Sequence, residues 1–408
     1  MLRHYYYLHG CRIWLQFIHA LTPRRYLWLS EWRPLNPNAF KRGKQLSDTT
    51  VNTELLVVGG GVVGVAVARH FALEGAQVIL LEREATVGAG TSSRNSGVIH
   101  AGLYYPEGSL KERLCIEGKS LLYRYCKDNR VPFEQTGKWI VSSAGQESRL
   151  QGIQDRAVKN NVPVRLLSHQ QIRSGAPELR CTAALESPST GIIAVHDLIQ
   201  SFVADLERAG GVVQCRAEAL SLCVEGGKAQ ALLRDGTRVE ADLAINAAGL
   251  DALGLVPEEV AHGYENYFLK GSYFSYGAKV PFKRLIYPLP QEEGLGIHLT
   301  LDLSGAARFG PDARRISGRD FSVNENDSAE FVTAISAYWP YCDANKLKPD
   351  YAGIRPKLIE DGSVIQDFVF LRNQLDDRYP IISLLGIDSP GLTSSLAIAG
   401  YVFDFSKT

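Results

Sequence analysis

The feature that most constrains the fold of this chain is a glycine-rich turn near residue 60. Residues 55–58 form a continuous apolar run of strand length, and the spacing Gly59-x-Gly61-x-x-Gly64 follows directly. Small residues come next, and a second apolar run ends at Glu82. A strand, a glycine turn, a helix and a second strand form the βαβ unit that binds dinucleotides. The pattern therefore predicts an α/β domain with a parallel sheet and a bound dinucleotide.

Each glycine of this turn, and the acid after it, has a physical role. Gly59 permits the tight turn, Gly61 lets the backbone approach a pyrophosphate, and Gly64 lets the helix pack close to the strand. The phosphates then lie at the helix N-terminus, where free N–H groups and the dipole favour anions. Glu82 is placed to hold both ribose hydroxyls, and its charge would repel a 2′-phosphate, so NADP is disfavoured. The turn alone leaves FAD and NAD open.

Charge and composition exclude several other classes of protein. The chain has 408 residues, 45% of them hydrophobic, which is enough for two domains. Lys+Arg and Asp+Glu are equal at 44 each, but residues 1–52 are basic and the remainder is mildly acidic. Such a body does not suit a nucleic-acid partner. The seven cysteines show no CxxC spacing, so neither a zinc site nor a disulfide framework is expected.

The first 52 residues differ in composition from the rest of the chain. They contain three of the five tryptophans, and residues 13–21 carry apolar side chains at helical spacing until Pro23. A short basic amphipathic helix is typical of a mitochondrial presequence. One alternative is a start codon placed too far upstream, in which case a cytoplasmic protein is expected. The other is a genuine N-terminal extension. Met1 is the only methionine, so a downstream start would need another codon, for instance at Val51.

Three further segments are rich in glycine and hydroxyl side chains. Residues 88–102 are too polar for packed core, residues 242–249 end a buried strand in small residues, and residues 389–399 begin a helix with hydroxyls. Their distance along the chain implies one ligand contacted from several parts of the sequence. In this the chain resembles the D-amino-acid-oxidase superfamily of FAD enzymes, whose flavin domain is discontinuous.

A narrower resemblance rests on longer runs of sequence. From about residue 53 to the end, the chain is similar to the family of L-2-hydroxyglutarate dehydrogenases or oxidases. The runs that carry the resemblance are residues 94–105, 109–118, 296–302, 307–312 and 390–397.

The resemblance implies a fold, a cofactor and a reaction. The expected fold is a Rossmann-like FAD domain of residues 53–132, 190–260 and 350–408. It is interleaved with an α+β substrate domain on an antiparallel sheet, residues 133–189 and 261–349. The implied reaction is oxidation of L-2-hydroxyglutarate, a small 2-hydroxy dicarboxylic acid, to 2-oxoglutarate by hydride transfer to FAD. A quinone, an electron-transfer flavoprotein or O₂ would accept the electrons, and peripheral membrane association is one prospect. An amine or amino-acid oxidase and a non-catalytic FAD-binding protein are the alternatives.

The residues predicted to contact FAD come from all of these segments. They are Gly59, Gly61, Gly64, Glu82, Arg83, Ser93, Asn95, Ser96, Gly97, Gly249, Gly391, Leu392, Thr393 and Ser394. The N–H groups of the helix that starts near Thr393 would stabilise the reduced flavin's negative charge.

The substrate's carboxylates require cations. Arg355 matches the superfamily's Gly-x-Arg-Pro position, where the resemblance implies a bidentate pair with a carboxylate, although a surface salt bridge is the plainer interpretation. Arg308, Lys270 and Arg94 compete for the second carboxylate, and Tyr104 is a candidate hydrogen-bond donor. The sequence does not rank them.

Two histidines are candidates for the base, because an imidazole titrates near neutrality. His100 lies in the loop expected to wrap the flavin, where it could act as base, as covalent tether or as a packed neighbour. His298 lies on an alternating strand, so it faces either the site or the opposite side.

The remaining chain predicts ordinary elements around this site. A strand is expected over residues 134–142, helices over 145–161 and 196–209, and strands over 212–247 with a tight turn at Asp235-Gly236. Alternating aromatic-rich strands are expected over residues 264–310.

Overall fold

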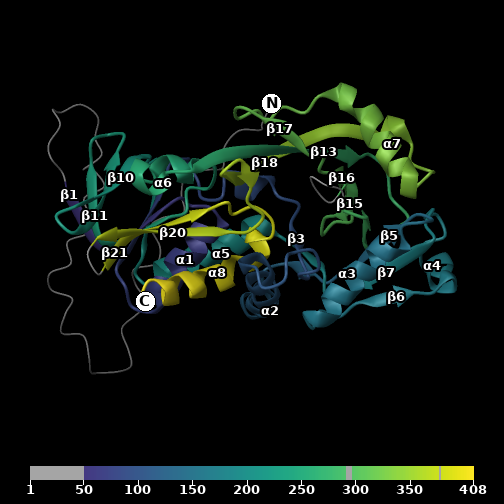
Figure 1. Ribbon diagram of the computed structural model, residues 1–408, viewed down its shortest axis with the longest axis horizontal. Helices are drawn as coiled ribbons and strands as arrows, with labels where there is room; N and C mark the ends of the chain where they lie inside the picture. Colours follow the sequence, from purple (N-terminus) through teal and green to yellow (C-terminus); the bar gives the residue numbers. More distant parts are fainter. Residues whose placement is uncertain (1–49, 291–295, 376–377) are drawn as a thin grey trace, which may run out of the picture. The chain divides into compact units, whose positions relative to one another are not determined.

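The computed structural model describes residues 50–290, 296–375 and 378–408, which form two large sheets and a small one (Figure 1). Residues 1–49 of the expected presequence lie outside the described part of the chain, and residues 50–52 begin the first strand. No helix in the described ranges is both long and apolar enough to cross a membrane. The expected combination of a parallel sheet with a largely antiparallel one is confirmed.

The first large sheet has eight strands around a parallel centre. β12, β1, β2 and β9 lie side by side in parallel, β21 joins β12 in parallel, and β10, β11 and β20 add antiparallel pairs. Its strands are β1 (Thr50–Val58), β2 (Val78–Glu82), β9 (Val212–Cys215), β10 (Ala219–Glu225), β11 (Lys228–Leu233), β12 (Arg238–Asn246), β20 (Val369–Leu375) and β21 (Arg378–Leu385).

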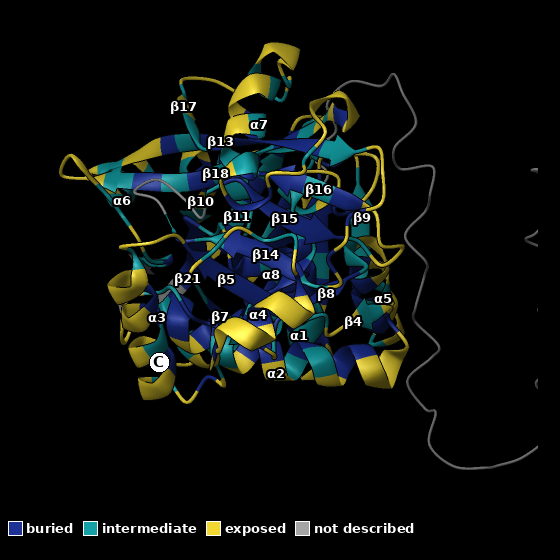
Figure 2. Ribbon diagram, turned by 90° about the vertical axis from the view of Figure 1, so that its right-hand side faces the viewer, coloured by how far each residue is buried: buried dark blue, intermediate teal, exposed yellow. Residues whose placement is uncertain are grey.

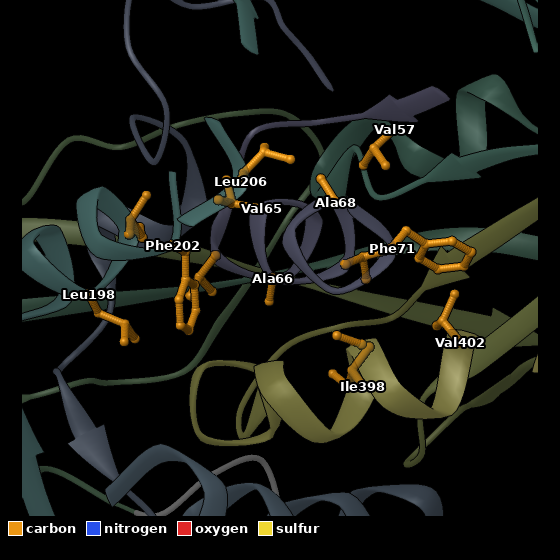
Figure 3. Packing of buried hydrophobic residues seen from close by; sticks show 14 of the residues in the cluster. Val57, Val65, Ala66, Ala68, Phe71, Leu198, Phe202, Leu206, Ile398 and Val402 are labelled. Carbon is orange, nitrogen blue, oxygen red and sulfur yellow. The ribbon is translucent and has the colours of Figure 1, made fainter. Parts of the chain in front are cut away.

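Helices α1 (Val62–Leu73), α5 (Val195–Arg208) and α8 (Gly391–Phe405) pack together beside this sheet. Figure 3 shows Phe202 of α5 and Ile398 of α8 on either side of α1, whose alanines give the neighbouring helices room to approach. Small side chains along a helix allow close packing, and burial of the large apolar ones stabilises the layer. This arrangement fixes the start of α1 against the sheet.

The second large sheet has ten strands and is mostly antiparallel. Its order is β19-β18-β13-β16-β15-β14-β5-β7-β6, with β17 on β13. Strands β5 and β14 at its centre are buried almost throughout (Figure 2). Its strands are β5 (Lys138–Ser142), β6 (Arg165–Leu167), β7 (Ala183–Ser187), β13 (Tyr264–Tyr276), β14 (Leu285–Pro288), β15 (His298–Leu301), β16 (Ala307–Gly310), β17 (Arg314–Ile316), β18 (Leu347–Glu360) and β19 (Ser363–Val364).

A small sheet and five further α-helices complete the described part of the chain. They are the small sheet of β3 (Val98–Ile99), β8 (Gly191–Ile193) and β4 (Phe133–Glu134), with helices α2 (Leu110–Asn129), α3 (Glu147–Lys159), α4 (His169–Gly175), α6 (Glu258–Ala261) and α7 (Ser328–Tyr338).

Most predicted elements of the chain are confirmed, with shifts at their ends. Helices α3 and α5 match the two predicted helices, and Gly236 makes the expected turn between β11 and β12. The strand predicted over residues 134–142 is wrong as one element: it divides into β4 and β5 at Gly137, whose φ of 70° breaks the extended backbone. β18 crosses the boundary expected at residue 350 and pairs with β13 along its length.

Helix α2 packs against the start of α8 through Gly118. A Cβ at this position would lie 2.5 Å from the Thr393 carbonyl oxygen, so Gly118→Ala should destabilise the fold by about 1–3 kcal/mol. Gly152 in α3 has open space around it, and Gly152→Ala should stabilise by about 0.5–1 kcal/mol. Urea unfolding of both variants checks this. Equal shifts in the same direction would contradict the close contact between α2 and α8.

Candidate functional site

A cavity of about 710 Å³ is lined by residues of both large sheets and of the loops between them. The segments that meet there are the glycine turn before α1, the end of β2, residues 89–100, the end of β12, the middle of β18 and the start of α8. Of the predicted residues, the lining includes Gly59, Gly61, Gly64, Glu82, Arg83, Asn95, Ser96, His100, Gly249, Arg355, Gly391 and Leu392. The predicted gathering of distant segments around one space is therefore present.

The glycine turn is too tightly packed for side chains. Gly59 has a φ of 110°, and a Cβ on it would lie 2.4 Å from the Ala247 carbonyl oxygen. A Cβ on Gly64 would lie 2.0 Å from the Gly59 carbonyl oxygen. At Gly61 the nearest atom is the Ser92 hydroxyl oxygen at 3.3 Å, so this backbone borders the cavity more openly. The three positions thus have the steric environments expected of a dinucleotide turn.

The N-terminus of α1 has a hydrogen-bond partner that was not among the residues predicted from the sequence. The Val62 N–H donates to the Ser92 hydroxyl at 2.9 Å, and both residues line the cavity. Ser92 belongs to the short 3₁₀ helix Thr91–Arg94 in the predicted wrapping loop. The hydroxyl-rich loop was the signal for it, but spacing alone could not choose among neighbouring serines.

Glu82 is held rigidly at the end of β2. Its carboxylate accepts from the Gly60 N–H and from the Glu84 N–H, each at 2.8 Å, and it is 8% exposed. The neighbouring Arg83 forms an ion pair with Asp251 at 2.7 Å. The remaining acceptor positions of the Glu82 carboxylate are available to hydroxyl donors in the cavity.

Four of the predicted cofactor residues lie off the cavity lining. The Ser93 hydroxyl bonds back to carbonyls of its own turn, and Gly97 packs against the Ile193 carbonyl and lines a smaller hollow. Thr393 and Ser394 are fully buried between α8 and its neighbours, because the first turn of α8 points these side chains into the protein. None of these four residues lines the cavity, and the predicted role of the N–H groups at the start of α8 stays a prediction. The Thr393 hydroxyl instead accepts from the His100 N–H at 3.0 Å.

Arg355 lines the cavity and forms no ion pair within the described ranges. Its Nη1 is buried without a hydrogen-bond partner among the described residues, and its Nη2 makes only a 3.5 Å contact to the Asp312 carbonyl oxygen. Buried polar groups are normally paired, so this guanidinium is a candidate site for an anionic ligand. The alternative of a surface salt bridge is wrong.

His100 lines the same cavity, and its Nε2 lies 3.2 Å from the Ser389 hydroxyl. Burial and the nearby Lys138 lower the pKa of His100 to about 3, so the ring is neutral at physiological pH. His298 is absent from the cavity lining. It is 3% exposed, its Nδ1 bonds the Gly296 carbonyl at 3.0 Å, and its ring stacks on Tyr287. A direct catalytic role for His298 is therefore not supported.

Two of the proposed cations for a second carboxylate are already paired. Lys270 forms an ion pair with Asp320 at 2.6 Å, and Arg308 with Asp350 at 2.6 Å. Lys270 pairs in the sheet with Ile354, one residue from Arg355, so the two cations lie on opposite faces.

The other two candidates have no carboxylate partner. Arg94 lines the cavity with its guanidinium over the ring of Phe321, and its Nη1 donates to the Ala352 carbonyl at 3.1 Å. Tyr104 lies off the lining, and its hydroxyl is buried without a partner among the described residues.

Two polar residues that sequence reasoning missed lie close to these groups. Tyr273 of β13 lines the cavity, and Lys138 of β5 is 1% exposed and near enough to His100 to affect its pKa. The available signal for Lys138 was its place directly before the apolar run of residues 139–141. Within the described residues no group of His, Cys, Asp or Glu is arranged to hold a metal ion.

Comparison with known proteins identifies the family. The family described as FAD dependent oxidoreductase matches residues 54–404. The chain belongs to this family. It is 35% identical over 399 residues to the mitochondrial L-2-hydroxyglutarate dehydrogenase of Arabidopsis thaliana, covering 86% of this chain and 82% of that protein. It is 25% identical to the L-2-hydroxyglutarate dehydrogenase of Escherichia coli, covering 87% and 93%.

Solved structures of other proteins share the fold of this chain. The dithionite-reduced L-α-glycerophosphate oxidase of Mycoplasma pneumoniae with FAD bound has a TM-score of 0.78 at 22% identity, covering 88% of this chain and 95% of that one. Glycine oxidase of Geobacillus kaustophilus has a TM-score of 0.73 at 18% identity, with the same coverages.

The cavity of this chain fits the family's cofactor. The packed glycine turn suits a pyrophosphate, and the rigid Glu82 carboxylate suits a ribose. Helix α8 begins at Gly391 on the lining, and the first N–H groups of a helix have no partner within it.

Proposed function

We propose that this protein oxidises L-2-hydroxyglutarate to 2-oxoglutarate with FAD as the immediate electron acceptor. The observation that carries the proposal is Arg355, which lacks an ion pair among the described residues, in a cavity fitted to FAD. The relatives named L-2-hydroxyglutarate dehydrogenase support the choice of acid, since they match over most of the chain in a plant, animals and bacteria.

Different residues around the cavity would bind the substrate and the cofactor in such a reaction. Arg355 binds the carboxylate next to the reacting carbon through its free Nη1. Gly59, Gly61, Gly64 and Glu82 would hold the nucleotide part of FAD, and the N–H groups at the start of α8 would be available to stabilise negative charge on its ring system. FAD, when bound, supplies the acceptor for the hydride that leaves the substrate carbon.

His100 takes the hydroxyl proton in this proposal. Its neutral ring has a nitrogen on the cavity side, next to the Ser389 hydroxyl. An anionic substrate at Arg355 would raise the pKa of His100 from its low value, because a nearby negative charge stabilises the imidazolium. Proton uptake by His100 is thus coupled to the arrival of the acid.

We also propose the wider setting that the relatives suggest. The eight-stranded sheet with its helices forms the FAD domain, and the ten-stranded sheet forms the substrate domain. The plant and animal relatives are named mitochondrial, which supports a mitochondrial location for this protein. A quinone, an electron-transfer flavoprotein or O₂ would reoxidise the cofactor.

Product analysis tests the proposal. Purified holoenzyme with an artificial electron-accepting dye should form 2-oxoglutarate from L-2-hydroxyglutarate, and none from the D-enantiomer. Faster turnover of glycine, proline or another amine would support an amine or amino-acid oxidase instead. Bound FAD without turnover of any of these acids or amines would support a non-catalytic flavoprotein.

A further inference from the structure

A cluster of polar groups that lack hydrogen-bond partners lies close to His100, outside the residues that line the cavity. Its central member is Lys138 on β5, whose ammonium lies 4.6 Å from the ring centre of Tyr104 and 4.5 Å from that of Tyr287. In the part of the chain that the structure describes, this ammonium has no ion pair and no hydrogen bond. The hydroxyls of Tyr104 and Tyr287 are also buried without partners there. We call Lys138, Tyr104 and Tyr287 the Lys138 cluster.

The sheet register holds the cluster in place. Leu285 of β14 pairs in parallel with Lys138, which puts Tyr287 two residues further along the same strand face. Ile286 pairs antiparallel with Leu299, so Tyr287 lies opposite His298, and their rings stack 3.8 Å apart. The three donors therefore lie on rigid strands or against them, not on free side chains at a surface.

Three buried donors without acceptors require an explanation. Buried polar groups almost always have a hydrogen-bond partner, and a buried ammonium needs an anion or several acceptors. Cation–π contacts with two tyrosine rings compensate part of the charge but satisfy no N–H. A ligand carboxylate supplies the negative charge and the acceptor oxygens that the cluster lacks.

We propose that the Lys138 cluster binds the second carboxylate of a dicarboxylic 2-hydroxy acid, an inference that rests on the proposed function. Arg355 takes the carboxylate next to the reacting carbon, and the chain of the acid passes His100. Lys270 and Arg308 are neutralised by their own carboxylates, and Lys270 lies on the other face of the sheet from Arg355. Arg94 is the competing cation.

Binding experiments without turnover separate these alternatives. The holoenzyme is titrated calorimetrically with glutarate and with pentanoate, which has a methyl group in place of the second carboxylate. Wild type should prefer glutarate by about 10- to 100-fold, the scale of a charge-assisted contact. Lys138→Met should abolish the preference and leave pentanoate affinity unchanged. Tyr287→Phe and Tyr104→Phe, which remove only hydroxyls, should each reduce it several-fold.

Controls on other residues guard against a general structural effect. Lys270→Met removes a lysine from the other face of the same sheet and should keep the glutarate preference. Methionine in place of an unpaired buried lysine should not harm folding. Equal affinities of the wild type for glutarate and pentanoate would overturn the proposal. Water would then be the partner of the donors in the Lys138 cluster. Loss of the preference in Arg94→Gln, with its retention in Lys138→Met, would also overturn it.

The pH dependence of binding gives an independent readout. Burial lowers the pKa of Lys138 to about 7, so the ammonium is charged below that pH and neutral above it. Without a ligand, burial lowers the pKa of His100 and of His298 to about 3 and raises that of Cys115 to about 12. Any rise in the pKa of His100 caused by an acid at Arg355 is common to glutarate and pentanoate, so it cancels in the preference. Burial also raises the pKa values of Tyr104 and Tyr287. The Lys119 ammonium, which interacts with Cys115, donates to the Ala101 carbonyl oxygen and to the Ser189 hydroxyl.

The glutarate preference of wild type should therefore fall as the pH rises above about 7, by up to tenfold per unit, because binding then requires proton uptake. Lys138→Met should show no such fall. A preference independent of pH from 6 to 9 in wild type would contradict the assignment to Lys138. These titrations do not depend on turnover. Failure to oxidise L-2-hydroxyglutarate would refute the proposed function alone, and oxidation without a glutarate preference would refute this inference alone.

Discussion

Arg355→Ala should lower kcat/KM for L-2-hydroxyglutarate by about 3 kcal/mol or more, mainly through a higher KM. The guanidinium is held in the cavity wall without a carboxylate partner, so its interaction energy is available to an anionic substrate. A buried charge-assisted pair is worth that much when one member is removed. Steady-state kinetics with a dye as electron acceptor measures the change.

The matched controls for Arg355 are in the same sheet. Arg355→Lys keeps the charge but loses the planar fork, and should recover only part of the loss. Arg308→Gln removes an arginine that is already paired with Asp350, and should change KM little. An unchanged KM in Arg355→Ala would remove this residue from the carboxylate site.

Glu82→Ala should yield protein that is largely free of FAD after purification. The carboxylate accepts two backbone N–H groups, and these bonds aim it at the cavity. Loss of its contacts with the ribose hydroxyls should weaken FAD binding by about tenfold or more. The ratio of flavin to protein, measured by absorbance after denaturation, gives the occupancy.

Glu54→Ala is the control for Glu82. Glu54 is an exposed acid on β1 that accepts from the Gln77 N–H, so its loss leaves the cavity intact. Circular dichroism should show that both variants are folded. Full flavin occupancy in Glu82→Ala would contradict the ribose assignment.

Local patterns predicted the glycine turn and the acid at the end of the second strand, which both lie at the cavity. The glycine turn depends on contacts between residues that are close in sequence or on the adjacent β12, so its spacing was sufficient. The paired strands and the acid at the end of β2 follow from the same short βαβ unit. The hydroxyl-rich loop was also predicted, but the sequence did not show which of its hydroxyls contacts α1. The Ser92 hydroxyl accepts from the start of α1, whereas the Ser93 hydroxyl bonds its own turn.

The arrangement of the residues on the substrate side of the cavity depends on the register between strands that are far apart in the chain. A single sequence does not contain this register. The pairing of β13 with β18 decides whether Lys270 or its neighbour faces the cavity. The paired residues are about 85 positions apart in the chain, and an irregularity near Ser272 interrupts the register. Lys138 meets Tyr287 only because β5 pairs with β14. Thr393 and Ser394 were assigned to the cofactor by their position at a helix start, and the packing of α8 on α2 turned them inward.

The absorbance spectrum of the purified holoenzyme under anaerobic conditions tests the central claim most directly. L-2-Hydroxyglutarate should bleach the flavin band, whereas D-2-hydroxyglutarate and amino acids should leave it unchanged. This result would establish cofactor, substrate and handedness together. A flavin band that L-2-hydroxyglutarate does not bleach, or that an amine bleaches faster, would contradict the account.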